Sequence, residues 1–202
     1  MKKIILTVAA VFAFGFANAQ ETKFGVKGGL NLANISGDVE DNSSKIGFNV
    51  GGFVEIKVSD KFSVQPELLF STQGTKFEES GSGFSAEVKY NLSYLNIPVM
   101  AKYYAADKFS LEFGPQIGFL TSAKADFTAT ESGVTESGKE DVKDDFESID
   151  FGLNFGAGYD LTEKLSLGLR YNLGLSNIGK FEAGDDSKLN NSVLSLSFGY
   201  KF

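Results

Sequence analysis

Apolar and polar residues alternate along most of the chain, with a period of two. The pattern is clearest near the C-terminus, where apolar residues take the odd positions from Ile149 to Leu161 and again from Leu165 to Leu175. Gly, Asn, Ser and Asp fill most of the positions between them. Successive side chains of a β-strand point to opposite faces, whereas a helix repeats every 3.6 residues. The alternation therefore predicts two-faced strands.

Eight segments carry this pattern, and they predict eight strands. Near Ser93 and Tyr94 the apolar residues of the fourth segment change parity, which predicts a β-bulge. Pro66 and Pro98 have no backbone N–H to donate to the hydrogen-bond ladder between strands. A proline is tolerated beside a bulge, where the ladder is interrupted, and Pro98 has such a position. The predicted strands cover about residues 23–33, 46–58, 62–76, 87–104, 109–123, 148–161, 165–177 and 192–202.

The connections between these segments alternate strictly between short and long. The short ones are residues 59–61, 107–108 and 162–164, and each precedes a similar apolar-Ser-apolar start. The long polar ones are residues 34–45, 77–86, 124–147 and 178–191. Bacterial outer-membrane barrels have short periplasmic turns and longer extracellular loops. The sequence thus predicts a closed, eight-stranded, antiparallel up-and-down transmembrane barrel.

The composition of the two strand faces decides between a membrane barrel and a soluble barrel. A soluble eight-stranded barrel keeps apolar residues inside. Here the less apolar face is mainly Gly, Ser and Asn, which suit a cramped interior better than a water-exposed strand face. The large apolar side chains are therefore expected to face lipid. Aromatic residues near the short turns form a candidate girdle: Phe62, Tyr103, Phe109, Tyr159, Tyr200 and Phe202.

The N-terminus predicts export. Lys2 and Lys3 precede an apolar run from Ile4 to Phe16, which is followed by Ala-Asn-Ala ending at Ala19. This run is shorter than the ~20 residues of a spanning helix. We expect residues 1–19 to be a cleaved signal peptide and residues 20–202 to be the barrel domain in the outer membrane of a diderm bacterium.

Composition removes several function classes. The chain contains no His and no Cys, which excludes His- or Cys-based nucleophilic catalysis, HExxH zinc sites and CxxC clusters. A net charge of −7 and a pI near 4.7 argue against nucleic-acid binding, which needs a clustered basic surface. We expect no enzymatic activity and no cofactor.

Strand parity places several charged residues in the bore. Arg170 is the only arginine, and a buried guanidinium needs carboxylate partners, so Glu67 or Glu112 is its expected partner. Together with Glu55 they predict a structural plug, while an ion or solute pathway is the alternative. The other charged residues expected in the bore are Lys57 and Asp150, with Lys23, Lys27 and Lys201 near the periplasmic mouth.

The longest connection, residues 124–147, is strongly acidic. Its composition predicts a solvated, mobile segment. Calcium binding and contact with a surface protein or glycan are alternatives, although the segment lacks DxDxDG spacing with a distal Glu. Its acidic residues are Asp126, Glu131, Glu136, Glu140, Asp141, Asp144, Asp145 and Glu147.

Five motifs resemble the PorT-like outer-membrane β-barrel family: YLNIPVMAKY from Tyr94, FGPQIG from Phe113, DFGLNFGAGY from Asp150, RYNLGLS from Arg170 and FGYKF from Phe198. The resemblance implies an integral outer-membrane protein and, for some members, participation in protein secretion or gliding machinery. It supplies no catalytic residues. The expected function is a structural or surface-interaction role through the extracellular loops, with a secretion accessory or a narrow channel as alternatives. The expected partners are outer-membrane lipid and secretion-machinery or extracellular proteins.

Overall fold

The computed structural model describes residues 21–39, 41–181 and 186–202, so the expected signal peptide lies outside the described residues. No helix in these ranges is long and apolar enough to cross a membrane. The described elements are β1 (Glu21–Gly37), β2 (Asn42–Ser59), β3 (Phe62–Gly81), β4 (Phe84–Ala106), β5 (Phe109–Glu131), β6 (Val134–Asp141), the 3-10 helix η1 (Lys143–Asp145), β7 (Ile149–Asp160), β8 (Leu165–Gly174) and β9 (Leu189–Lys201).

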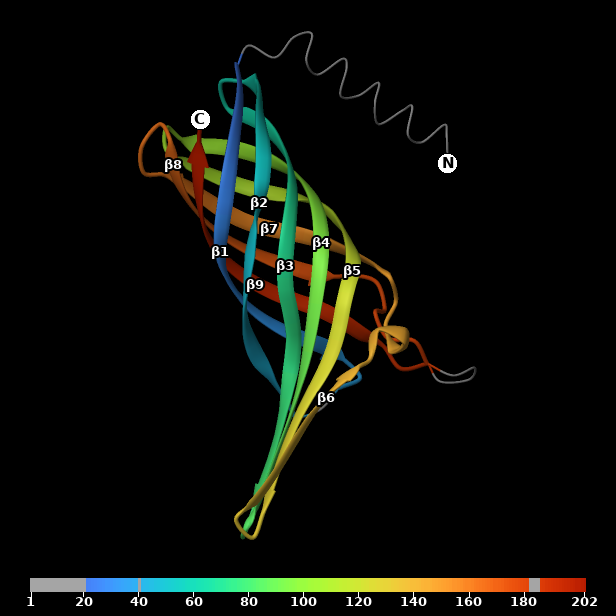
Figure 1. Ribbon diagram of the computed structural model, residues 1–202. Helices are drawn as coiled ribbons and strands as arrows, with labels where there is room; N and C mark the ends of the chain where they lie inside the picture. Colours follow the sequence, from blue (N-terminus) through green and yellow to red (C-terminus); the bar gives the residue numbers. More distant parts are fainter. Residues whose placement is uncertain (1–20, 40, 182–185) are drawn as a thin grey trace.

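Eight of these strands form a ring in the order β1-β2-β3-β4-β5-β7-β8-β9 (Figure 1). The first and last strands close the ring, because β1 pairs with β9 in antiparallel register from Gly25↔Lys201 to Gly37↔Leu189. Closure satisfies backbone groups that would otherwise lie unpaired at an edge in hydrocarbon. The predicted eight-stranded up-and-down barrel is confirmed.

Side chains alternate between the outside of the ring and its bore. On β7, Phe155 is 45% exposed whereas the adjacent Asn154 is 1% exposed. The six aromatic residues expected as a girdle are at least 37% exposed on the outer face, at the end of the ring with the short turns. Phe62 lies opposite Tyr103, and Phe109 lies opposite Tyr159.

Glycines on the inner face let neighbouring strands approach closely. A Cβ atom at Gly51 would collide with the carbonyl oxygen of Leu68, and one at Gly114 would collide with that of Val99. Any larger residue at these positions would push the paired strands apart. This explains why glycine, rather than another small residue, is found there.

At the end opposite the short turns, β3, β4 and β5 run on beyond the ring. Together with β6 they form a projecting four-stranded sheet, residues 75–90 and 124–141, which we call the blade (Figure 1). The long polar connections expected over residues 77–86 and 124–147 are therefore mostly strand, and apart from the tight turns only the segment between β6 and β7 remains a connection. Ser132 and Gly133 both have positive φ (52° and 84°), as a two-residue type I′ hairpin turn requires.

The register shift predicted near Ser93 and Tyr94 is present between β4 and β5. The extra residue is Thr121 of β5, and β4 itself keeps its parity. The expected reason for the change in apolar parity is therefore wrong. Leu92 and Tyr94 point into the bore and are fully buried, whereas Leu95 faces outward.

Candidate functional site

Three charged side chains meet in the middle of the bore. Arg170 of β8 donates from both terminal nitrogens to the two carboxylate oxygens of Glu67, each at 2.9 Å, and its Nη2 also donates to Glu112 at 2.8 Å. Lys27 of β1 donates to Glu67 at 3.3 Å, and Gln65 donates to it at 2.7 Å. The bidentate geometry and the additional donors are what a buried ion pair needs to offset its desolvation.

The charges continue as an alternating chain toward the short turns. Lys102 of β4 lies 3.6 Å from Glu112 and donates to Glu55 at 3.2 Å. Lys201 then joins Glu55, at 3.1 Å, to Asp160, at 3.1 Å. Four cations and four anions thus balance one another along this chain of contacts. We call these eight residues the ionic network: Lys27, Lys102, Arg170, Lys201, Glu55, Glu67, Glu112 and Asp160.

The structure brings together the four residues expected as a plug, since Arg170 contacts both Glu67 and Glu112 and Lys102 links Glu112 to Glu55. Lys27 lies beside Glu67, deeper than the mouth position expected from the sequence. Lys201 lies within the network through Glu55 and Asp160.

The other charged residues expected in the bore lie at the two ends of the bore. Lys57 pairs with Asp60 in a short turn at 3.3 Å. Asp150 lies toward the blade end and accepts hydrogen bonds from Ser176, at 2.9 Å, and Asn191, at 2.8 Å.

Sequence reasoning missed Lys102, although it is 4% exposed and links two carboxylates. The signal was available, because Lys102 alternates with the outward-facing Ala101 and Tyr103 of the same strand. Asp160 was missed as well, although the predicted strand over residues 148–161 includes it at the same parity as Asp150.

A layer of amide side chains fills the bore between the ionic network and the blade end. Asn49 donates to Asn31 at 2.7 Å, and Asn31 donates to Ser71 at 2.9 Å. On the other side, Asn172 donates to Asn154 at 3.2 Å. The spaces beside Arg170 are only about 30 Å³ each, room for about two water molecules.

Above the amides, an apolar cap covers the mouth of the ring. The cap is a buried cluster to which β4 contributes Leu92 and Tyr94, and the connection after β8 contributes Ile178, all 0% exposed. Phe146, which follows η1, is held there by a β-bridge to Gly179. The other buried members of the cap are Ile35, Leu120 and Ala123.

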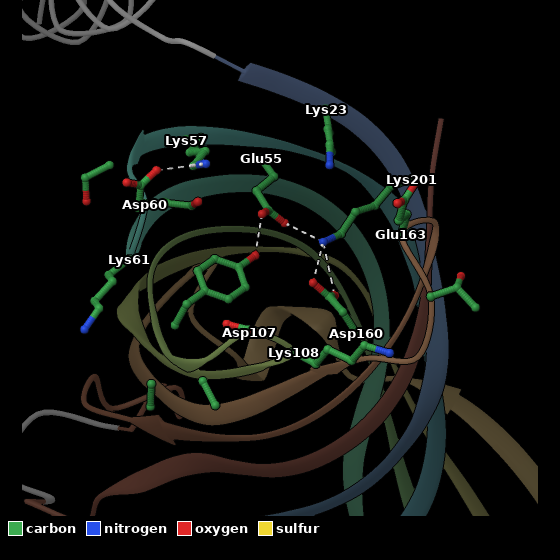
Figure 2. Close-up of a pocket in the computed structure, with 16 residues that line it drawn as sticks. Lys23, Glu55, Lys57, Asp60, Lys61, Asp107, Lys108, Asp160, Glu163 and Lys201 are labelled. Atoms are coloured by element: carbon green, nitrogen blue, oxygen red, sulfur yellow. Dashed lines mark hydrogen bonds and ion pairs between the residues drawn. The ribbon is translucent and has the colours of Figure 1, made fainter.

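The opposite mouth opens into a vestibule of about 660 Å³ (Figure 2). Its floor is the end of the ionic network, where Tyr104 donates a hydrogen bond to Glu55 and Lys201 bridges Glu55 and Asp160. Its rim carries charges of both signs from the short turns: Lys57, Asp60, Lys61, Asp107, Lys108 and Glu163.

Within the described residues, no group of three or more acidic side chains could hold a metal ion. The acidic residues of the 124–147 segment lie apart on the blade strands and the connection that follows them. In the blade, Asp126 instead pairs with Lys139 at 3.1 Å.

A sequence profile of the outer membrane protein beta-barrel domain matches residues 16–180. The chain belongs to this family. The family places this barrel in the bacterial outer membrane. Barrels of that membrane have their short turns on the periplasmic side, and by this rule the vestibule faces the periplasm and the cap and the blade face the cell exterior.

Two solved structures are similar to this chain. Neisserial surface protein A is 14% identical, with 91% of this chain and 100% of that chain covered and a TM-score of 0.53. The attachment invasion locus protein Ail of Yersinia pestis is 16% identical over 91% of this chain and 100% of that chain, with a TM-score of 0.48. At 14% identity the first likeness shows the fold alone. No curated protein matches the sequence.

Replacing Arg170 with alanine tests the ionic network. The change leaves Glu67 and Glu112 buried without their main partner, and removing one side of a buried ion pair costs about 3–5 kcal/mol. We expect the free energy of unfolding of the barrel, measured by denaturant titration in detergent micelles, to fall by that amount. Lys61→Ala in an exposed turn is the control, with an expected change below about 0.5 kcal/mol. An unchanged midpoint for Arg170→Ala would refute the plug.

Proposed function

We propose that this barrel is a non-catalytic, non-conducting outer-membrane protein that presents the blade to the cell exterior as an interaction surface. The observation that carries the proposal is the filled bore. The ionic network, the amide layer and the apolar cap occupy it in succession, while β3, β4 and β5 continue pairing beyond it. A rigid sheet outside the membrane is the part of the barrel best suited to hold a partner.

The filled bore also disfavours the channel alternative. An ion crossing the barrel would have to separate Arg170 from Glu67 and Glu112 in a space with room for about two water molecules. It would then have to pass an apolar cap that offers few polar groups to replace its hydration shell. Catalysis lacks support as well, because the chain contains no His or Cys.

An accessory role in protein secretion is the second candidate. It rests on the PorT-like motifs and on the vestibule, whose mixed charges are open to periplasmic proteins (Figure 2). Crosslinking from turn positions such as Lys108, followed by capture from membranes, is the test. We further propose that residues 1–19 are removed during export.

Planar-bilayer recording tests the absence of conduction. We expect the purified, refolded barrel to give no discrete current steps, because no continuous aqueous path passes the ionic network. A general porin reconstituted in the same bilayer provides the positive control. Discrete steps whose ion selectivity reverses on altering Glu67 or Glu112 would establish the channel instead.

Cysteine labelling tests the exposure of the blade. The chain contains no native cysteine, so Ser82→Cys, in the turn between β3 and β4, and Asp107→Cys, in a short turn, each introduce a single thiol. A polymer-linked maleimide too large for porins should label position 82 on intact cells and position 107 only after the outer membrane is permeabilised. The reverse pattern would place the blade in the periplasm and contradict the proposed function.

A further inference from the structure

The two faces of the blade differ sharply in composition. Residues that pair directly across antiparallel strands share one face of a sheet, and the register places Phe77, Val88, Phe127 and Gly138 in one row. We call the face that carries this row the apolar face. Its apolar residues are Phe77, Phe84, Ala86, Val88, Tyr90, Ala125, Phe127, Ala129 and Val134.

The opposite face is polar, and its charges neutralise one another. Three ion pairs lie across it or along its strands, each at 3.1 Å or less, and Ser and Thr occupy most of the remaining positions. These pairs are Lys76–Glu78 at 2.8 Å, Lys89–Glu87 at 2.6 Å and Lys139–Asp126 at 3.1 Å. Such a face is suited to water.

The charges of the apolar face are not neutralised. They are all carboxylates, and among the described residues none of them takes part in an ion pair. No lysine or arginine shares this face. The four residues are Glu79, Glu131, Glu136 and Glu140.

Large apolar side chains are open to solvent on the same face. Phe127 is 44% exposed, Phe84 is 39% exposed and Val134 is 67% exposed. The face lies beyond the membrane, so lipid does not explain this exposure. Soluble surfaces rarely leave a contiguous apolar patch without a partner.

The apolar face is continuous with the cap. The ring of Phe77 lies 6.0 Å from that of Tyr90, and Tyr90 lies 6.3 Å from Phe146 of the cap. Farther out, Phe127 packs over Gly138 of β6, where a Cβ atom would strike the ring. These contacts fix the aromatic groups on a rigid surface, so binding to it would cost little ordering entropy.

We propose that the apolar face of the blade binds a cationic, amphipathic polypeptide segment of an extracellular protein. The inference rests on the proposed function and names the partner class for its interaction surface. Apolar side chains of the segment would cover Phe84 and Phe127, while its lysines or arginines would pair with the unneutralised glutamates. A second copy of the acidic chain, or a lipid phosphate, would bring like charges together on this face.

Fluorescence anisotropy with a defined probe tests the proposal. The probe is a short labelled peptide in which lysine and valine alternate, and a peptide alternating glutamate and valine is its control. The full barrel is held in nanodiscs of zwitterionic lipid, and empty nanodiscs give the background. We expect the lysine peptide to bind, with an affinity that falls as salt is added, and the glutamate peptide not to bind.

Matched charge variants separate the two faces. The apolar-face variant combines Glu79→Gln, Glu131→Gln and Glu136→Gln, and the polar-face variant combines Glu78→Gln, Glu87→Gln and Asp126→Asn. Both change the net charge equally. We expect the first to weaken binding of the lysine peptide about tenfold or more and the second to leave it within about twofold. Equal weakening by both variants would show unspecific attraction and overturn the proposal.

A separate variant tests the apolar contribution. Phe84→Ser, next to a turn, should weaken binding of the lysine peptide without altering the heat-modifiable migration of the folded barrel. The proposal would be overturned if the wild-type barrel did not bind the lysine peptide. It would also be overturned if the barrel associated with itself and Phe84→Ser abolished that association. Either result leaves the conductance and cysteine-labelling experiments intact, so failure of this inference is distinguishable from failure of the proposed function.

Discussion

The need to fill a narrow ring of strands governs the rest of this structure. Eight strands enclose a bore just wide enough for side chains. The outer face of the ring must be apolar because it contacts lipid, so the polar side chains of the strands point into the bore. Buried charges there are costly unless they are paired or well hydrogen-bonded. Arg170, Glu67 and Glu112 meet this condition at the centre, and Lys102 and Lys201 extend it toward the periplasm. A bore packed in this way supports the proposal that the barrel acts through its surface rather than through a pore.

The same strands reverse their apolar side at the membrane boundary. Below the register shift, β4 directs Leu95 and Ile97 outward to lipid and Asn96 inward. Above it, Tyr90 points inward and Lys89 outward, although the strand has not changed parity. The reversal follows from the change of solvent, because the outside of the blade meets water. It also explains why the inward-facing positions of these strands are polar within the bore but apolar in the cap and on the apolar face of the blade.

The sequence predicted the barrel well because the period of two is a direct consequence of strand geometry. Alternating short and long connections predicted the up-and-down order of the strands, and the single arginine pointed to its carboxylate partners. The polar segments around Phe84 and Val134 were expected to be loops because Ser, Gly and Glu are common in loops. Their cross-strand pairing became visible only in three dimensions. The cap was missed because the apolar residues of β4, Leu92 and Tyr94 among them, were all expected to face lipid, whereas Lys102 could have been placed in the bore from the outward-facing Ala101 and Tyr103 on either side of it.

Site-directed nitroxide labelling at Phe155 and Asn154 tests the central claim most directly, because these neighbours on β7 face opposite sides of the wall. In bilayers, a label at position 155 should collide readily with oxygen, which concentrates in lipid, and be shielded from a water-soluble nickel complex. A label at position 154 should be immobilised and shielded from both. Strong collisions with the nickel complex at position 155 would mean that the apolar side of the wall faces water, and the account of a filled, membrane-embedded ring would be wrong.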